Sequence, residues 1–339
     1  MAKTSFRVHV QNPLESDATN LEFAITNEIW SAAASRRPDL VRDVQLSIGW
    51  SSADFDRMMG DAEILISWTG TIKAHFDRRD RPAMPNLKWL FATSAGLDRL
   101  APFDWLPAGA RLCNNSGTHT VKAGEYGMMA LLMINATMPQ FMVQQRECRY
   151  EKIFSTVIAG KTVLIVGLGH IGGAIAARAR QFGMRVIGIR ANPQPHSACD
   201  HVFGIDALDQ MLPEADFVLL SLPLTAQTRG LMNRAGLDRM KSTAGLINMA
   251  RGPVLDEDAL CDKLDRGEIQ GAVLDVYGQE PVPAESRLWT TRNLIMTPHV
   301  SSDDLSAYIP RSLDIFFDNL AAWRQGLPLP NAIDPKRGY

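Results

Sequence analysis

The chain has 339 residues, with 35 Lys and Arg against 37 Asp and Glu, so its formal net charge is -2. A protein without excess positive charge is poorly suited to bind a polyanion, which argues against a nucleic-acid-binding or membrane-surface role. Hydrophobic residues make up 46% and charged residues 21%, the usage of a globular protein rather than of a disordered one. At roughly 150 residues per domain, the length predicts about two domains.

The cysteines and the N-terminus restrict the class of protein further. The 4 cysteines are scattered without a C-x-x-C pair or a partnering His cluster, which argues against structural zinc and against a disulfide framework, so we expect no metal. The N-terminal residues lack the apolar segment of a signal peptide, and no window approaches the roughly 18 apolar residues of a membrane span. We therefore expect a soluble, cytoplasmic protein.

Short apolar runs alternate with longer amphipathic stretches, a pattern typical of βαβ units and parallel sheets. Helices are predicted at Ile171–Phe182, Asp256–Arg266 and Asp303–Gln325, and the Met-rich stretch Met128–Met142 predicts a packed core or interface helix, because Met fills irregular gaps. The predicted strands are Phe6–Val10, Glu63–Ser67, Lys88–Ala92, Thr162–Val166, Arg185–Ile189, Asp216–Ser221, Ala244–Asn248, Ala272–Val276 and Leu294–Met296.

A glycine-rich loop joins the strand Thr162–Val166 to the helix that follows, with the sequence Gly167-Leu-Gly169-His170-Ile171-Gly172. A G-x-G-x-x-G motif becomes strong evidence for dinucleotide binding when a strand precedes it and a helix follows. In that context Gly167 makes the tight turn, Gly169 lets a pyrophosphate approach the backbone, and Gly172 permits close helix–strand packing. The helix N-terminus then offers free N–H groups to the phosphates. The alternative is a turn in an ordinary βαβ unit that binds no phosphate.

The next strand ends at Arg190, 18 residues after Gly172, where an NAD-binding fold normally carries Asp or Glu for the ribose hydroxyls. A guanidinium cannot accept those hydrogen bonds, but it can form charge-assisted bonds to a 2′-phosphate. We therefore predict that NADP(H) is preferred and that NAD(H) is a possible second cofactor. The alternative is a solvated arginine and a relaxed cofactor choice.

Three later segments follow predicted strands and carry Arg251, Glu280 and His299. Ligands of open parallel sheets bind beyond the carboxyl ends of the strands, so these side chains are expected to converge near the glycine loop. Reduction of a 2-oxo acid needs a fixed cation for the substrate, the role predicted for Arg251, and a proton donor for the developing alkoxide, the role predicted for His299. Glu280 would orient the imidazole and favour its charged form.

With these residues the sequence resembles the D-isomer-specific 2-hydroxyacid dehydrogenases, from about Asn86 to the C-terminus. The motifs that carry the resemblance are Gly167–Gly172, Leu222-Pro223-Leu224-Thr225 with Thr228, Asn248–Gly252, Asp275-Val276 with Glu280-Pro281, Thr297-Pro298-His299 and the closing Asn331–Tyr339.

This resemblance implies an α/β fold of two doubly wound parallel-sheet domains, Rossmann-like or flavodoxin-like, with a cleft between them. A discontinuous substrate-binding (catalytic) domain would comprise residues 1–117 and 298–339, and a dinucleotide-binding Rossmann domain residues 118–297. The family is typically dimeric, so a homodimer is expected, with the Met-rich helix as the candidate interface.

The resemblance also implies roles for individual residues. Arg251, Glu280 and His299 would be catalytic, and Arg251 and His299 would contact the substrate as well. The loop containing Ser94, Ala95 and Gly96 would hold the substrate carboxylate. Independently of the resemblance, Trp68 follows the strand Glu63–Ser67 and would either narrow the substrate pocket or anchor the core. The cofactor-binding residues would be Gly167, Gly169, His170, Ile171, Gly172, Arg190, Pro223, Thr228, Ala250 and Asp275.

The segment after His299 departs from the family, because it continues Ser301-Ser302-Asp303-Asp304. The two carboxylates either cap the following helix, which is the favoured interpretation because Asp is a preferred N-cap residue, or tune the proton affinity of His299. Tyr308 and Arg311 are further candidates to reach the substrate.

Two classes of function remain open at this stage. The favoured one is an oxidoreductase that transfers a hydride reversibly from NADPH to a 2-oxo acid, namely glyoxylate, hydroxypyruvate or a bulkier homologue, to give the (R)-2-hydroxy acid. This would place the chain nearest in type to the NADPH-dependent glyoxylate/hydroxypyruvate reductases. The alternative is a dinucleotide-sensing, corepressor-like binding protein on the same fold, against which the complete set of Arg251, Glu280 and His299 argues.

Overall fold

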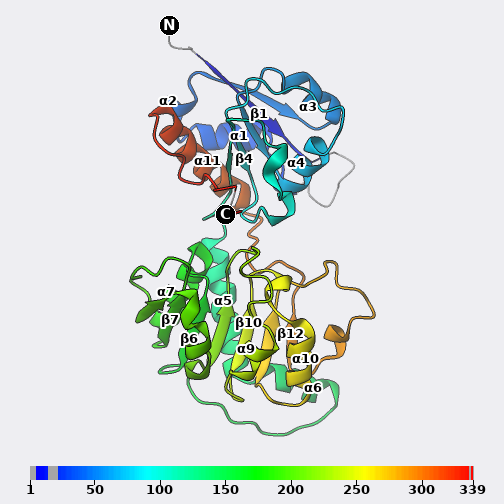
Figure 1. Cartoon of the computed structure of the whole chain (residues 1–339), viewed down its shortest axis with the longest axis vertical. Helices are drawn as coiled ribbons and strands as arrows, with labels where there is room; N and C mark the ends of the chain where they lie inside the picture. The colour runs from blue at the N-terminus through cyan, green and yellow to red at the C-terminus, as the bar shows by residue number, and fades with distance from the viewer. Residues whose placement is uncertain (1–4, 14–21, 336, 339) are drawn as a thin grey trace. The chain divides into compact units, whose positions relative to one another are not determined.

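The computed structural model describes residues 5–13, 22–335 and 337–338, and its contacts divide the chain into two compact units. Unit 1 comprises Met1–Thr118 and Asp304–Tyr339, and unit 2 comprises His119–Asp303. The predicted boundaries lie at 117/118 and 297/298, one and six residues from these. Of the predicted closing motif, Lys336 and Tyr339 lie outside the described residues. Each unit is an α/β structure built on its own sheet (Figure 1).

Unit 2 contains a sheet of seven parallel strands in the order β12-β11-β10-β9-β6-β7-β8. The order reverses direction at β6, which lies between β9 and β7, as in a doubly wound fold. The strands are β6 (Thr162–Val166), β7 (Arg185–Ile189), β8 (His201–Phe203), β9 (Phe217–Leu220), β10 (Gly245–Asn248), β11 (Gly271–Leu274) and β12 (Leu294–Met296).

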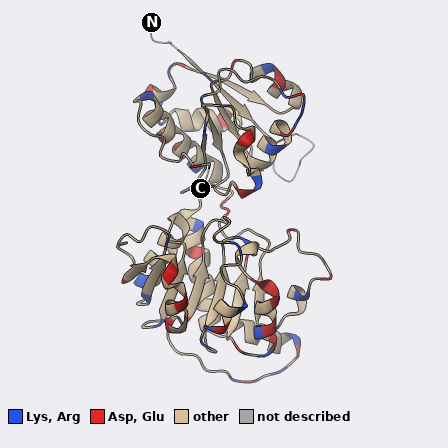
Figure 2. Cartoon of the chain, viewed as in Figure 1, with Lys and Arg blue, Asp and Glu red and all other residues tan. Residues whose placement is uncertain are grey.

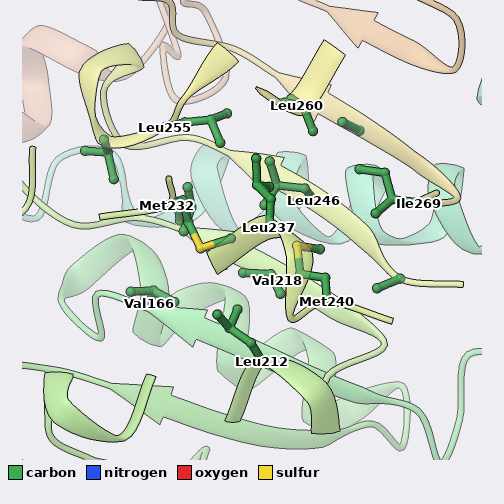
Figure 3. Packing of buried hydrophobic residues seen from close by; sticks show 14 of the residues in the cluster. Val166, Leu212, Val218, Met232, Leu237, Met240, Leu246, Leu255, Leu260 and Ile269 are labelled. Carbon is green, nitrogen blue, oxygen red and sulfur yellow. The ribbon is translucent and has the colours of Figure 1, made fainter. Parts of the chain in front are cut away.

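Helices cover both faces of this sheet because successive side chains of each buried strand point to opposite sides. Val163 and Ile165 of β6 pack on one face with α5 and α7, while Leu164 and Val166 pack on the other with α9 and α10. Figure 3 shows the second cluster, in which Val166, Leu212 and Met232 lie close together. The helices are α5 (Thr120–Asn135), α6 (Met138–Arg146), α7 (His170–Gln181), α8 (Leu208–Met211), α9 (Arg234–Asp238) and α10 (Glu257–Asp265).

Unit 1 contains a sheet of five parallel strands in the order β2-β1-β3-β4-β5, with α1 and α11 packed on one face and α3 and α4 on the other. Its strands are β1 (Phe6–Gln11), β2 (Val44–Gly49), β3 (Ile64–Ser67), β4 (Trp89–Ala92) and β5 (Arg111–Cys113). Its helices are α1 (Asn27–Ala34), α2 (Pro38–Val41), α3 (Ser52–Met58), α4 (Thr69–Phe76) and α11 (Tyr308–Arg324).

The structure corrects two of the predicted helices. The Met-rich stretch is not one helix: it is broken between α5 and α6 at Thr137, whose φ of 57° is left-handed. The last helix begins at Tyr308 rather than at Asp303, because the residues after His299 form turns. Neither aspartate caps it, since its N-cap is Ala307 and no side chain makes a cap hydrogen bond there.

Acidic and basic residues are mixed along the chain. Figure 2 shows acidic and basic residues interspersed along the ribbons of both units. Within the described part of the chain, no helix combines the length and apolar character needed to cross a membrane.

Candidate active site

The predicted functional segments of unit 2 all follow strands of one parallel sheet. The glycine loop follows β6, the Arg251 segment follows β10, the Glu280 segment follows β11 and the His299 segment follows β12. Because the strands are parallel, these segments all lie beyond the carboxyl ends of the strands, which is where open α/β sheets bind ligands.

The geometry of the glycine loop matches the demands of a bound dinucleotide. Gly167 has φ +100°, and a Cβ there would lie 2.6 Å from the backbone nitrogen of Leu222. A Cβ on Gly172 would lie 2.1 Å from the carbonyl oxygen of Gly167, so this position needs glycine to let α7 approach β6. A Cβ on Gly169, by contrast, would meet nothing within 4 Å. The space over Gly169 is therefore open to a phosphate.

The N-terminus of α7 can receive that phosphate. Gly169 is its N-cap, and no side chain caps the first turn. Gly169 and His170 are exposed, whereas Ile171 is half-buried. Backbone N–H groups of a helical first turn attract anions, so these residues fit the pyrophosphate of a nicotinamide dinucleotide. When bound, the nicotinamide of such a cofactor would supply or accept the hydride.

The remaining predicted cofactor contacts lie beside this loop along the sheet edge. Arg190 directly follows β7, the neighbour of β6, and is half-buried, with its Nε donating to the carbonyl oxygen of Asn192 at 2.6 Å. Thr228 links the two ends of the loop after β9, because its hydroxyl donates a hydrogen bond to the carbonyl oxygen of Pro223 at 2.7 Å. Pro223 itself is exposed.

Arg251 is fixed by the turn that follows β10. The side-chain oxygen of Asn248 accepts a hydrogen bond from the backbone nitrogen of Ala250 at 3.0 Å, and its amide donates to the carbonyl oxygen of Arg251. The guanidinium folds back to donate to the carbonyl oxygen of Ala250 at 2.7 Å. The next residue must be glycine, since a Cβ on Gly252 would collide with the backbone of Tyr277.

His299 and Glu280 form a direct pair. The Nδ1 atom of His299 lies 2.9 Å from Oε2 of Glu280, while Oε1 of Glu280 accepts the backbone N–H of Tyr277 at 3.0 Å. The His299 side chain is 40% exposed. Because the carboxylate engages Nδ1, Nε2 is the ring nitrogen left to exchange a proton with a substrate.

A buried carboxylate holds the loop that carries His299. Asp275 is 1% exposed, and it accepts hydrogen bonds from the Thr297 hydroxyl at 2.6 Å and from the backbone nitrogens of Val300 and Ser301, both at 3.0 Å. The Thr297 hydroxyl has one proton and gives it to Asp275, so it accepts from the hydroxyl of Tyr126 at 2.6 Å. Asp275 thus orients the loop, and its contact with a nicotinamide stays a prediction.

The structure adds two groups that the sequence did not single out together. His119 is the N-cap of α5, and its Nδ1 lies 3.0 Å from the carbonyl oxygen of Ser302 and 3.9 Å from the carboxylate of Asp303. Burial, more than any other cause, lowers the pKa of His119 and raises the pKa of Asp303. No local sequence signal links the two, because only the fold brings the residue before α5 to the residues after β12.

In unit 1, the predicted substrate loop follows β4. The Oγ of Ser94 lies 3.1 Å from Oγ1 of Thr69, and the carbonyl oxygen of Ala95 accepts from the amide of Asn114 at 3.0 Å. Gly96 is half-buried.

Trp68, also half-buried, follows β3 and is the N-cap of α4, so the residues after it form a helix. A Cβ on Gly70 would lie 2.3 Å from Cζ3 of Trp68, which means that the indole packs over the first turn of α4.

Two further substrate candidates have other partners. Tyr308 is buried, and its hydroxyl donates to the carbonyl oxygen of Thr93. Arg311 donates to the carboxylate of Asp304 at 3.1 Å. Both side chains therefore have partners within unit 1. Within the described residues, no group of three or more His, Cys, Asp or Glu could hold a metal ion.

Comparison with known proteins assigns the family. The family described as D-isomer specific 2-hydroxyacid dehydrogenase, NAD binding domain, matches residues 128–301. The glyoxylate/hydroxypyruvate reductase B of Yersinia pestis (strain Pestoides F) is 36% identical over 226 residues, which cover 64% of this chain and 69% of that protein.

Two solved structures extend the similarity over nearly the whole chain. A D-isomer specific 2-hydroxyacid dehydrogenase from Xanthobacter autotrophicus Py2, in complex with NADPH and MES, has a TM-score of 0.78 at 28% identity, covering 99% of this chain and 100% of that one. An NADPH-dependent glyoxylate/hydroxypyruvate reductase from Sinorhizobium meliloti, in complex with NADP and sulfate, has a TM-score of 0.80 at 25% identity with the same coverage. The chain therefore belongs to the D-isomer-specific 2-hydroxyacid dehydrogenases, a family of oxidoreductases that use a nicotinamide dinucleotide.

Proposed function

We propose that this enzyme reduces a 2-oxo acid such as glyoxylate, hydroxypyruvate or a bulkier homologue to the (R)-2-hydroxy acid, reversibly and with NADPH. The observation that carries the proposal is the 2.9 Å pair of His299 and Glu280 at the sheet edge that also bears Arg251 and the glycine loop. Relatives named as glyoxylate/hydroxypyruvate reductases support the choice of small oxo acids.

Each of these side chains has a defined task in the proposed reaction. Arg251 orients the substrate through its carboxylate and carbonyl oxygens, because a guanidinium presents planar, paired donors. His299 gives a proton from Nε2 to the oxygen that becomes an alkoxide. Glu280 holds the ring at Nδ1 and stabilises its charged form. In the oxidative direction His299 takes the proton back.

Substrate binding also involves unit 1 in this proposal. The backbone of Ser94, Ala95 and Gly96 would hold the substrate carboxylate, since glycine permits close approach to N–H groups. Trp68 would limit the size of the substrate. A Trp68→Ala variant should then accept larger oxo acids relative to glyoxylate, whereas an unchanged substrate ranking would assign Trp68 to packing alone.

The NADPH preference rests on Arg190, which stands where a carboxylate would bind the ribose of NAD(H). Relatives solved with NADPH or NADP support this assignment. Arg190→Ala should weaken NADPH binding about 10- to 150-fold, because a charge-assisted hydrogen bond contributes about 1.5–3 kcal/mol, and leave NADH binding nearly unchanged. Arg185→Ala is a matched control, since Arg185 is exposed at the opposite end of the same strand. Equal effects on both cofactors would contradict the assignment.

We also propose a homodimer. Met129 and Met138 are 42% and 39% exposed in the Met-rich stretch, and Tyr150 and Phe154 in the segment after α6 are 94% and 89% exposed. Large exposed apolar side chains of this kind mark association surfaces. Sedimentation equilibrium should show that the wild type is a dimer. A Tyr150→Ser, Phe154→Ser double variant should have a higher dimer dissociation constant. A monomeric wild type would refute the proposal.

The central test is absorbance at 340 nm in a matrix of NADPH and NADH against glyoxylate, hydroxypyruvate, pyruvate, phenylpyruvate and 2-oxoisocaproate. Oxidation of NADPH with one or two oxo acids supports the proposal and identifies the substrate size. Oxidation of NADH alone overturns the assignment of Arg190. If every mixture is inactive while cofactor binds, these substrates are wrong and the search should turn to cofactor-dependent partner proteins.

A further inference from the structure

His119 contacts the loop that carries the acid/base histidine. It stands at the start of α5, and its Nδ1 lies 3.0 Å from the carbonyl oxygen of Ser302, three residues after His299. A carbonyl oxygen only accepts hydrogen bonds, so Nδ1 carries the proton in this contact. The side chain of His119 is 14% exposed, and the contact is therefore largely shielded from competing water.

The loop that His119 contacts carries a strained residue. His299 has a left-handed φ of 56°, a conformation that costs a non-glycine residue roughly 1–3 kcal/mol and persists only where the surroundings fix it. Asp275 binds the loop at Thr297, Val300 and Ser301. His119 binds the next residue, Ser302, and so adds a fourth point of attachment to the three that Asp275 provides.

We propose that His119 is a positioning residue for His299, and that its Nδ1–H tethers the carbonyl of Ser302 and thereby fixes the acid/base loop. This inference rests on the proposed role of His299 and adds a residue to it. His119 acts through the backbone of the loop.

The charges around His119 are compatible with a tether that is neutral at neutral pH. The groups that face it are Asp303, Arg251 and His299, and Asp303 in turn faces Asp275. Burial first, and then the positive charges of Arg251 and His299, lower the pKa of His119 against the opposing effects of Ser302 and Asp303. A neutral ring avoids a further positive charge beside Arg251, and Nδ1–H is present in both the neutral and the charged form. The tether therefore does not require His119 to be charged.

Two variants of similar size separate a tether from general packing. In His119→Asn the amide nitrogen can occupy the place of Nδ1, whereas in His119→Gln it reaches the place of Nε2. We expect the Asn variant to keep turnover within about threefold of wild type and the Gln variant to lose about 10-fold or more. Cofactor Kd should stay within threefold in both, which verifies that unit 2 is folded.

Hydrogen exchange of the peptide that contains residues 299–303 gives a readout independent of turnover. The Gln variant should exchange faster there than wild type, and the Asn variant should not. Equal turnover and equal exchange in the two variants would overturn the tether. If wild type itself reduces no oxo acid, the proposed function fails, and the exchange rates alone then support the tether or overturn it.

Discussion

Gly169 is the position where the fold and the cofactor impose different demands. A Cβ there would meet no protein atom within 4 Å, and the residue has φ -93° and ψ -155°, which alanine can adopt. Gly169→Ala should therefore leave the fold intact. Because alanine restricts the unfolded chain, the free energy of unfolding should stay unchanged or rise by about 0.4–1 kcal/mol.

The same methyl group would occupy the space over the first turn of α7 that a pyrophosphate needs. Displacing the phosphate from one charge-assisted N–H contact costs about 1.5–3 kcal/mol, which corresponds to a Kd increase of roughly 10- to 150-fold. Titration calorimetry with NADPH and with NADH should show this loss for both cofactors, since both carry the pyrophosphate.

Gly172→Ala should have the opposite effect and destabilise the fold. Its Cβ would lie 2.1 Å from the carbonyl oxygen of Gly167 and 2.9 Å from Oγ of Ser221, so α7 must move away from β6. Overpacking of this kind costs about 1–3 kcal/mol, or a fall in Tm on the order of 2–10 °C. Gly60→Ala is the control, because its Cβ also meets nothing within 4 Å but lies in unit 1. Wild-type cofactor affinity in Gly169→Ala, or a wild-type Tm in Gly172→Ala, would refute this account of the loop.

Further predictions concern the acid/base group, its electrostatics and the thiols. His299→Ala should lower kcat on the order of 100-fold or more, and survival within a few-fold would mean that another group donates the proton. Burial raises the pKa of Asp303, so an acid limb of kcat/KM that reports this carboxyl should be lost in Asp303→Asn and should stay in place in Asp304→Asn. Burial raises the pKa of Cys199 to about 11, and maleimide at pH 7 should label exposed Cys148 first. If maleimide labels any other thiol before Cys148, the expected order of exposure is wrong.

Most of the strands that could be predicted from the sequence have neighbours on both sides; β12, an edge strand with the predicted bounds Leu294–Met296, is the exception. β6 and β7 have the predicted bounds because both faces of each strand are covered, which gives an uninterrupted apolar run. The three strands that the pattern missed, β2, β5 and β8, lie at sheet edges. An edge strand is shorter or only partly buried, so its sequence carries a weaker apolar signal.

The positions of the candidate site residues could be predicted from one rule: the residues that follow parallel strands all lie at the carboxyl ends of those strands. That rule predicted the neighbourhood of Glu280 and His299, but it could not predict that Asp303 faces His119. This contact depends on how the start of α5 packs against the turns after β12, which no local pattern encodes. The N-cap assignment of Asp303 failed for the same reason, because turn geometry outside a helix is set by tertiary contacts rather than by propensity.

The position of His299 therefore depends on the sheet, through Asp275, as well as on the proposed contact of His119 with the loop. The strained φ of 56° at His299 would cost roughly 1–3 kcal/mol. The carboxylate of Asp275 accepts hydrogen bonds from Thr297, Val300 and Ser301, and bonds to a charged group contribute about 1.5–3 kcal/mol each. Three such bonds exceed the cost of the strain. Because Asp275 directly follows β11, the proposed acid/base group is anchored to the end of a buried strand although its own segment has no regular structure.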